Sequence, residues 1–255
     1  MKRVLNKTLN LIVILPLVTL FIYSIFINYQ YDDVLPSLIS FRNYKIVFNE
    51  ENIKVLLYSI ILSLASSFLS VIASYLFVRV LRIYKCSIAN ILKLLSAIPI
   101  LVPAFSYIMG IGVALNLIGI NDTIFGVIIS HAIVILPYSI FLLDNSFEII
   151  GEEYEELAFI LGANEIKTVF DISLPMLRQS IFNSLAIGFV ISFSQYFITL
   201  IIGGGVVKTY AMIIFPLIQG NNRGLASASA LIYCLINIII YMFFIKKDNN
   251  IIQQL

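Results

Sequence analysis

Long apolar runs recur along the whole chain and limit what it can fold into. Hydrophobic residues make up 60% of the 255 residues, and charged residues make up only 12%. The mean hydropathy is +1.01. Soluble globular domains carry about 25% charged residues, whereas a helix of about 20 apolar residues is long enough to cross a membrane. The sequence therefore predicts an all-α polytopic membrane protein.

The apolar runs predict six transmembrane helices within one transmembrane domain, residues 1–255. The expected spans are residues 9–28, 54–78, 92–117, 123–146, 180–202 and 225–245. The first run follows a basic start but lacks a cleavage pattern of small residues, so it is expected to be a retained span and not a signal peptide.

The distribution of Lys and Arg predicts the orientation of these spans, because cytoplasmic loops are enriched in both. With the N-terminus inside, the cytoplasmic side collects Lys2, Arg3, Lys7, Arg79, Arg82, Lys85, Lys93, Lys167, Arg178, Lys246 and Lys247. The other side keeps Arg42, Lys45, Lys54, Lys208 and Arg223. The N- and C-termini are therefore expected in the cytoplasm, together with the acidic segment between spans four and five.

This acidic segment, residues 148–178, has the pattern of two short helices joined by a turn. Tyr154, Leu157, Ala158 and Leu161 fall on one apolar helix face. Gly162 follows them, where helices commonly end in a left-handed residue.

The second short helix is expected to begin at the N-cap Asn164 and to close at Leu174-Pro175, since proline cannot continue the helical hydrogen bonds but can open the next helix. Its buried side is expected to hold Ile166, Val169 and Phe170. The segment is thus predicted to be a compact element at the cytoplasmic membrane face, suited to a groove on a partner.

The segment also resembles the EAA loop of binding-protein-dependent ABC importer permeases, in which Glu-Ala-Ala leads to Gly-Ala and then to Leu-Pro. This sequence has Leu157 in place of the first Ala, and Leu161 where Asp is frequent. The resemblance implies the type I importer permease fold, with a coupling helix between spans four and five. The ATPase-coupling residues it implies are Glu156, Leu157, Ala158, Gly162, Ala163, Leu174 and Pro175.

The same resemblance implies the function and the partners. The chain is expected to be the permease subunit of an importer in the bacterial plasma membrane, without enzymatic activity and without a cofactor or metal of its own. A cytoplasmic ABC ATPase dimer would use ATP and Mg. A second permease, expected to be a different chain with a copy of this one as the alternative, would complete the pathway. An extracytoplasmic binding protein would deliver the solute. No nucleic-acid partner is expected, since the small net charge of +2 does not point to one.

Polar residues within the spans are candidates for the translocation path, since polarity is costly at membrane depth. They are His131, Ser192, Ser194 and Gln195. For His131, a packing hydrogen bond is the alternative. The serine stripe of the second span, Ser59, Ser63, Ser67, Ser70 and Ser74, is expected to pack against neighbouring helices, with pore lining as the alternative.

The expected solute is a polyamine, because spans three and four resemble those of the polyamine, iron and thiamine permeases; iron, thiamine or a small anion are the alternatives. A secondary transporter without an ATPase is the competing function. No acidic or basic residue lies clearly at mid-membrane, which argues against ion-coupled transport.

Overall fold

The computed structural model describes residues 14–27, 38–83, 88–150, 153–220 and 222–252. The chain divides into two compact units, Met1–Tyr58 with Thr209–Ile238 and Ser59–Lys208 with Ile239–Leu255. Helices α3 (Glu50–Ile83) and α13 (Arg223–Ile252) each contribute residues to both units.

The first unit holds a helix, Ile14–Ser24, followed by a short antiparallel pair of strands, β1 (Phe26–Ile27) and β2 (Leu38–Ile39). Helix α2 (Arg42–Val47) follows the strands, and α12 (Tyr210–Gln219) comes later in the chain. The buried amide of Asn43 donates to the carbonyl oxygens of Ser24 and Phe26, at 3.0 and 2.9 Å. This contact ties α2 to the end of the first helix.

The second unit is built on α7 (Ile124–Ile150) and α10 (Leu174–Phe193), which pack along each other. Its other elements are α4 (Ala89–Ser96), α5 (Ile98–Leu101), α6 (Ala104–Leu117), α8 (Glu153–Ile160), α9 (Glu165–Lys167), the π-helical turn η1 (Thr168–Ser173) and α11 (Phe197–Ile202). An apolar cluster of Tyr75, Val78, Ile140, Leu143, Phe147 and Leu177 joins α3, α7 and α10. We refer to it below as the apolar cluster.

The serine stripe of α3 is buried, with each of its five side chains at most 2% exposed. The Ser67 hydroxyl donates to the carbonyl oxygen of Leu185 in α10, at 2.9 Å. A Cβ atom on Gly188 would lie only 2.6 Å from Ser67 Oγ, so glycine allows α3 and α10 to approach closely here. The predicted packing role of the stripe is confirmed.

The segment expected as a third span, residues 92–117, is divided into α4, α5 and α6. Val102 has an extended backbone, with φ −98° and ψ 138°, and Pro103 follows it. A residue before proline is pushed away from the helical region by the proline ring. The helix therefore breaks at this dipeptide, and a single helix over 92–117 is not formed.

Four helices in the described part of the chain are long and apolar enough to cross a membrane: Glu50–Ile83, Ile124–Ile149, Glu165–Phe193 and Arg223–Ile245. They overlap the expected spans two, four, five and six, although the one matched to span five begins at Glu165 and ends at Phe193, where 180–202 was expected. The fifth is interrupted at residues 194–196, before α11. In the expected first span, residues 9–13 and 28 lie outside the described residues, as do both chain termini.

Candidate coupling surface

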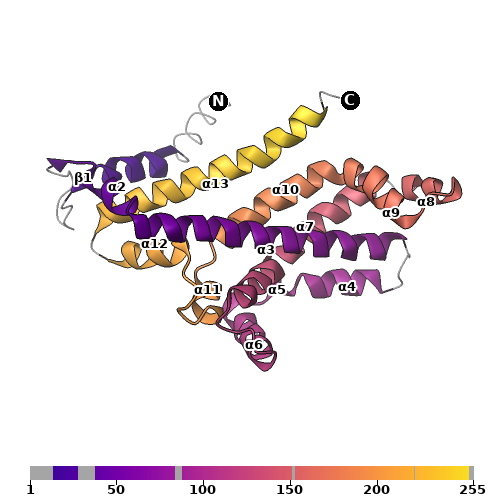
Figure 1. Cartoon of the computed structure of the whole chain (residues 1–255), viewed down its shortest axis with the longest axis horizontal. Helices are drawn as coiled ribbons and strands as arrows, with labels where there is room; N and C mark the ends of the chain where they lie inside the picture. The colour runs from indigo at the N-terminus through magenta and orange to yellow at the C-terminus, as the bar shows by residue number, and fades with distance from the viewer. Residues whose placement is uncertain (1–13, 28–37, 84–87, 151–152, 221, 253–255) are drawn as a thin grey trace, which may run out of the picture. The chain divides into compact units, whose positions relative to one another are not determined.

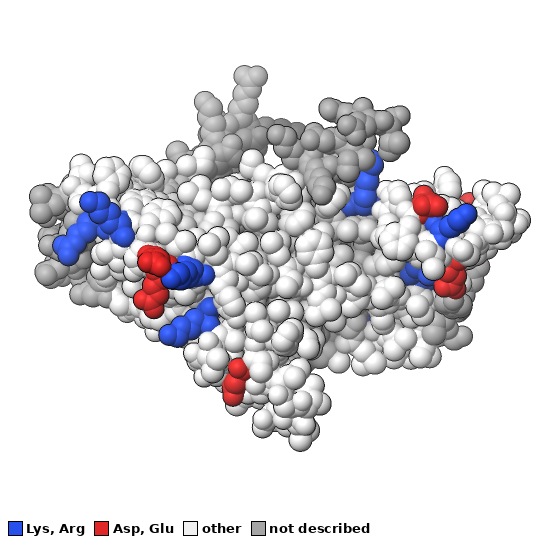
Figure 2. Space-filling view, in the orientation of Figure 1, with Lys and Arg blue, Asp and Glu red and all other residues white. Residues whose placement is uncertain are grey.

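The elements α8, α9 and η1 lie at one end of α7 and α10 (Figure 1). Acidic and basic side chains gather at this end on the face shown in Figure 2, and uncharged surface adjoins them. Charge at the end of long apolar helices is the distribution expected where such helices leave a membrane. We call residues 153–175 the coupling segment.

Helix α8 turns a polar residue inward and apolar residues outward. Glu155 and Ala158 are its buried residues, whereas Tyr154, Leu157 and Leu161 are more than half exposed. The apolar face expected from the spacing therefore points mostly away from the unit. The predicted burial of Ile166 and Phe170 is likewise wrong, since both are exposed. Val169 is partly buried against the apolar cluster, as predicted.

The turn after α8 has the predicted geometry. Gly162 has φ +86°, which a glycine adopts without steric cost. Its N–H donates to the carbonyl of Phe159, and the Ala163 N–H donates to that of Ala158, at 3.0 and 2.9 Å. This bond pair is a Schellman motif.

The predicted N-cap is also confirmed, because the Asn164 side chain accepts from the Lys167 N–H at 2.9 Å. Both signals act within a few residues, so local sequence determines this turn.

The second helix does not end at Leu174-Pro175 as expected, although Pro175 does open the next helix, α10, as predicted. The chain stays helical from Glu165 to Phe193, and Pro175 lies in the first turn of α10. The turn before it is the π-helix η1, in which the Leu174 N–H bonds to the Val169 carbonyl. A wider turn of this kind is one way for a helix to accommodate the missing N–H of a proline.

The other residues implied by the resemblance differ in their exposure. Glu156 and Pro175 are exposed, Ala163 is half-buried, and Leu174 packs partly buried against the apolar cluster.

Glu155 is the residue of the coupling segment that sequence reasoning missed. Its Oε2 accepts from Arg79 Nη2 at 3.1 Å and from Arg79 Nε at 3.2 Å. Its Oε1 accepts from the Ser173 hydroxyl. Both charged side chains are nearly buried, at 11% exposure for Arg79 and 7% for Glu155. Four neighbouring glutamates look alike in sequence, and Arg79 is 76 residues away, so no local signal marks the buried one.

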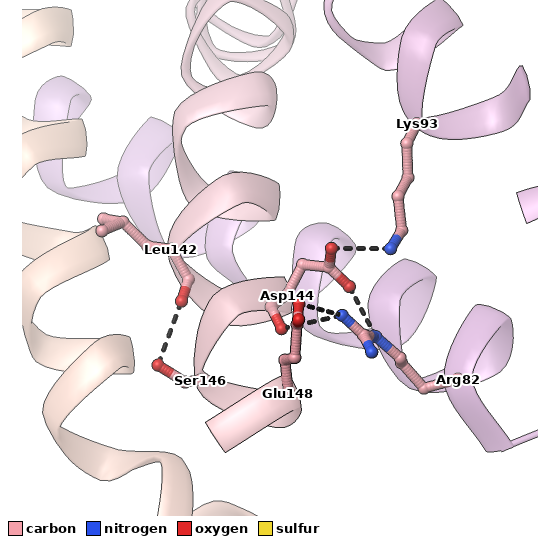
Figure 3. Close-up of polar contacts among 6 residues, drawn as sticks. All are labelled: Arg82, Lys93, Leu142, Asp144, Ser146 and Glu148. Atoms are coloured by element: carbon pink, nitrogen blue, oxygen red, sulfur yellow. Dashed lines mark hydrogen bonds and ion pairs between the residues drawn. The ribbon is translucent and has the colours of Figure 1, made fainter. Parts of the chain in front are cut away.

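A second ion-pair cluster surrounds Asp144, near the C-terminal end of α7 (Figure 3). Arg82 Nε donates to Asp144 Oδ1 at 2.7 Å, and Lys93 Nζ donates to Oδ2 at 2.6 Å. Arg82 also reaches the Glu148 carboxylate, at 3.3 Å. The carboxylate of Asp144 in α7 therefore bridges α3 and α4. Charge-assisted bonds of this length are among the stronger ones in proteins.

Two of the four predicted pathway residues, His131 and Ser192, come together in a buried hydrogen-bonded contact. His131 is 1% exposed. Its Nδ1 bonds Ser192 Oγ at 2.8 Å and its Nε2 bonds Thr199 Oγ1 at 3.0 Å. The Thr199 hydroxyl donates to the Gln195 carbonyl, so it accepts from Nε2–H, and Nδ1 accepts from the Ser192 hydroxyl.

The side chains of the other two predicted residues lie elsewhere. Ser194 is exposed and donates to the Ile191 carbonyl, and Gln195 is half-buried at the break between α10 and α11. Thr199, which completes the histidine contact, was not among the predicted residues; its place four residues after Gln195 gives no functional signal. The histidine contact thus fastens α7 to the interrupted fifth span.

Named relatives of this chain are transport permeases. It is 30% identical over 182 residues to the ferric transport system permease protein FbpB of Actinobacillus pleuropneumoniae, an alignment covering 63% of this chain and 26% of that protein. It is 28% identical over 211 residues to the spermidine/putrescine transport system permease protein PotC homolog of Mycoplasma genitalium, covering 79% and 73%. It is 29% identical over 100 residues to the molybdenum transport system permease protein ModB of Azotobacter vinelandii, covering 38% and 44%.

The alignments cover different shares of these relatives. The chain spans about a quarter of the length of the ferric permeases it matches. The family model described as binding-protein-dependent transport system inner membrane component matches residues 66–245. That range includes α7, the coupling segment and α10. The chain therefore belongs to this family of multi-pass membrane proteins, the permeases of ABC importers.

Proposed function

We propose that this chain is the membrane subunit of an ATP-driven importer and that its coupling segment docks in a cytoplasmic ATPase. One observation carries the docking proposal. The segment exposes large apolar side chains, while its buried Glu155 pairs with Arg79 of α3. Ile160 and Leu161 are 81% and 79% exposed, and Tyr154, Leu157, Ile166 and Phe170 are also exposed. Apolar side chains presented together on short helices suit a hydrophobic groove on a partner.

The docking proposal is tested by changing an exposed side chain that the fold does not need. Leu161→Asp places a charge in the proposed interface, and burying an unpaired charge is strongly unfavourable. We expect this variant to insert and to purify normally but to lose the ATPase on co-purification. Leu161→Met, which keeps an apolar side chain, retains the ATPase. Equal recovery of the ATPase with both variants would refute the docking surface.

The remaining parts of the importer are proposals on the same basis. The ATPase uses ATP and Mg, a second permease completes the pathway, and a separate extracytoplasmic protein delivers the solute. The membrane is the bacterial plasma membrane, with both termini in the cytoplasm, as the Lys and Arg distribution favours. The exposed stripe of Phe105, Met109, Val113 and Leu117 on α6 offers an apolar face to lipid or to the second permease.

We propose a polyamine as the solute, supported by the named specificity of the Mycoplasma relative, with ferric iron as the second candidate from the Actinobacillus relative. Uptake of radiolabelled spermidine and of ferric iron is compared in cells with and without the gene. Loss of spermidine uptake alone supports the polyamine, and loss of iron uptake alone refutes it.

A further inference from the structure

We propose that Arg79, Glu155 and Ser173 form an anchor through which α3 follows the coupling segment when the ATPase moves it. We call these three residues the α3 anchor. The inference rests on the proposed function, because it concerns how movement at the docking surface reaches the helices. Helices α7 and α10 flank the coupling segment in the chain, whereas α3 is joined to it by non-covalent contacts, so an explicit link is needed.

The geometry of the Glu155 carboxylate makes this link specific. Its two oxygens are used by different elements, Oε2 by Arg79 from α3 and Oε1 by Ser173 from η1. One side chain of α8 therefore holds two other elements at once. If α8 moved without α3, Arg79 and Glu155 would be left with unpaired charges in a nearly buried site. Such separation is costly, since the surrounding protein cannot replace the lost solvation.

Residues of α3 next to the α3 anchor also contact other helices of the unit. Tyr75 and Val78, within one turn of Arg79, belong to the apolar cluster shared with α7 and α10. Arg82, three residues after Arg79, bonds Asp144 in α7, and Asp144 also bonds Lys93 in α4 (Figure 3). The last turns of α3 are therefore held on several sides. Movement of α8 is expected to carry α3, α4 and α7 at this end as one body.

The test measures whether α8 and α3 keep their separation while the ATPase works. Spin labels are placed at Glu153→Cys in α8 and Leu76→Cys in α3, both exposed positions, after Cys86 and Cys234 are changed to Ser. The distance between the labels is recorded in the complex with its ATPase, without nucleotide and with ATP and vanadate. We expect the same narrow distribution in both states when the α3 anchor is intact.

The deciding variant is the double substitution Arg79→Gln with Glu155→Gln. It removes both charges, so neither is left buried without its partner. We expect the complex to remain assembled while the label distance shifts between the two states by more than its own width. Arg79→Lys, which keeps the charge, retains the fixed distance. Ser173→Ala, which removes only the hydrogen bond to Oε1, gives a smaller shift.

The matched control is another ion pair of α3, Lys54–Glu50, which is 2.6 Å long and exposed. Changing both of its residues to Gln is expected to leave the label distance constant. If Arg79→Gln with Glu155→Gln also leaves it constant while the ATPase is bound, packing alone carries α3 and this inference is overturned. If the ATPase fails to co-purify even with the unmodified chain, the proposed function is overturned and the inference falls with it.

Discussion

At the scale of single residues, Gly162 has the most predictable backbone requirement. Its φ of +86° is strained for any L side chain, although a Cβ atom there would meet nothing within 4 Å. Gly162→Val is expected to lower the free energy of unfolding by about 1–2 kcal/mol. Gly162→Asn is expected to cost less, because asparagine tolerates this conformation. Chemical unfolding of the detergent-solubilised protein measures both, and equal losses would contradict the backbone explanation.

His131 provides a second prediction at this scale. Replacing it by Leu fills the space with an apolar side chain and leaves the buried Ser192 hydroxyl without its imidazole partner, while the Thr199 hydroxyl keeps its bond to the Gln195 carbonyl. We expect a loss of about 1–3 kcal/mol, the usual penalty for unsatisfied buried polar groups. Ser194→Ala, an exposed neighbour, serves as the control and is expected to change the unfolding free energy little. A stable His131→Leu protein would show that the contact is dispensable for folding.

At the scale of elements, the contact between α3 and α10 depends on the absence of one methyl group. Gly188→Ala would bring Cβ to 2.6 Å from Ser67 Oγ and 2.9 Å from Ile135 Cγ2. We expect it to destabilise the protein by about 1–3 kcal/mol, as overpacking of a core does. Adding Ser67→Ala should recover part of this loss, because the two sites are in contact.

The matched control for this prediction is Gly110→Ala in α6. A Cβ atom at that position would meet nothing within 4 Å, and alanine favours helices over glycine. Thermal unfolding is expected to show no loss for this variant. If Gly110→Ala and Gly188→Ala behaved alike, close approach of the helices would not be the reason for glycine at 188.

The elements also show what local sequence determines. The Gly162 turn and the Asn164 cap follow from residues a few positions apart, and both were predictable. The inward face of α8 was not, because burial of Glu155 depends on Arg79, far away in the chain. The helix break before Pro103 is the opposite case. Hydropathy predicted one helix there, although the proline restricts the backbone of the preceding Val102. Apolar spacing alone therefore located the coupling segment but not its buried side.

At the scale of the whole molecule, the proposed orientation is open to direct measurement. Helix α7 has 27 residues, about 40 Å, which exceeds the membrane core of about 30 Å. The coupling segment follows its C-terminal end. The turn after α11 adjoins its N-terminal end, where the Asp122 N–H donates to the Ile202 carbonyl. The two sites should therefore lie on opposite sides of the membrane.

Single cysteines at Val206 and Glu153, both exposed, test this orientation in a chain with Cys86 and Cys234 changed to Ser. A membrane-impermeant maleimide added to intact cells is expected to label Val206→Cys alone. Permeabilised cells should show labelling at both positions, which is the control for reactivity. The opposite pattern in intact cells would place the coupling segment outside and exclude a cytoplasmic ATPase as its partner.

The unbroken helix from Glu165 to Phe193 would enlarge the displacement that the proposed docking movement produces. Its 29 residues make a rod of about 44 Å. A rod of that length that tilts by about 5° at the docking end displaces its far end by about 4 Å. That far end is the break at residues 194–196, beside the His131 contact. A lever of this kind converts a small rotation at the docking end into a displacement wider than a water molecule at the other end of the helix.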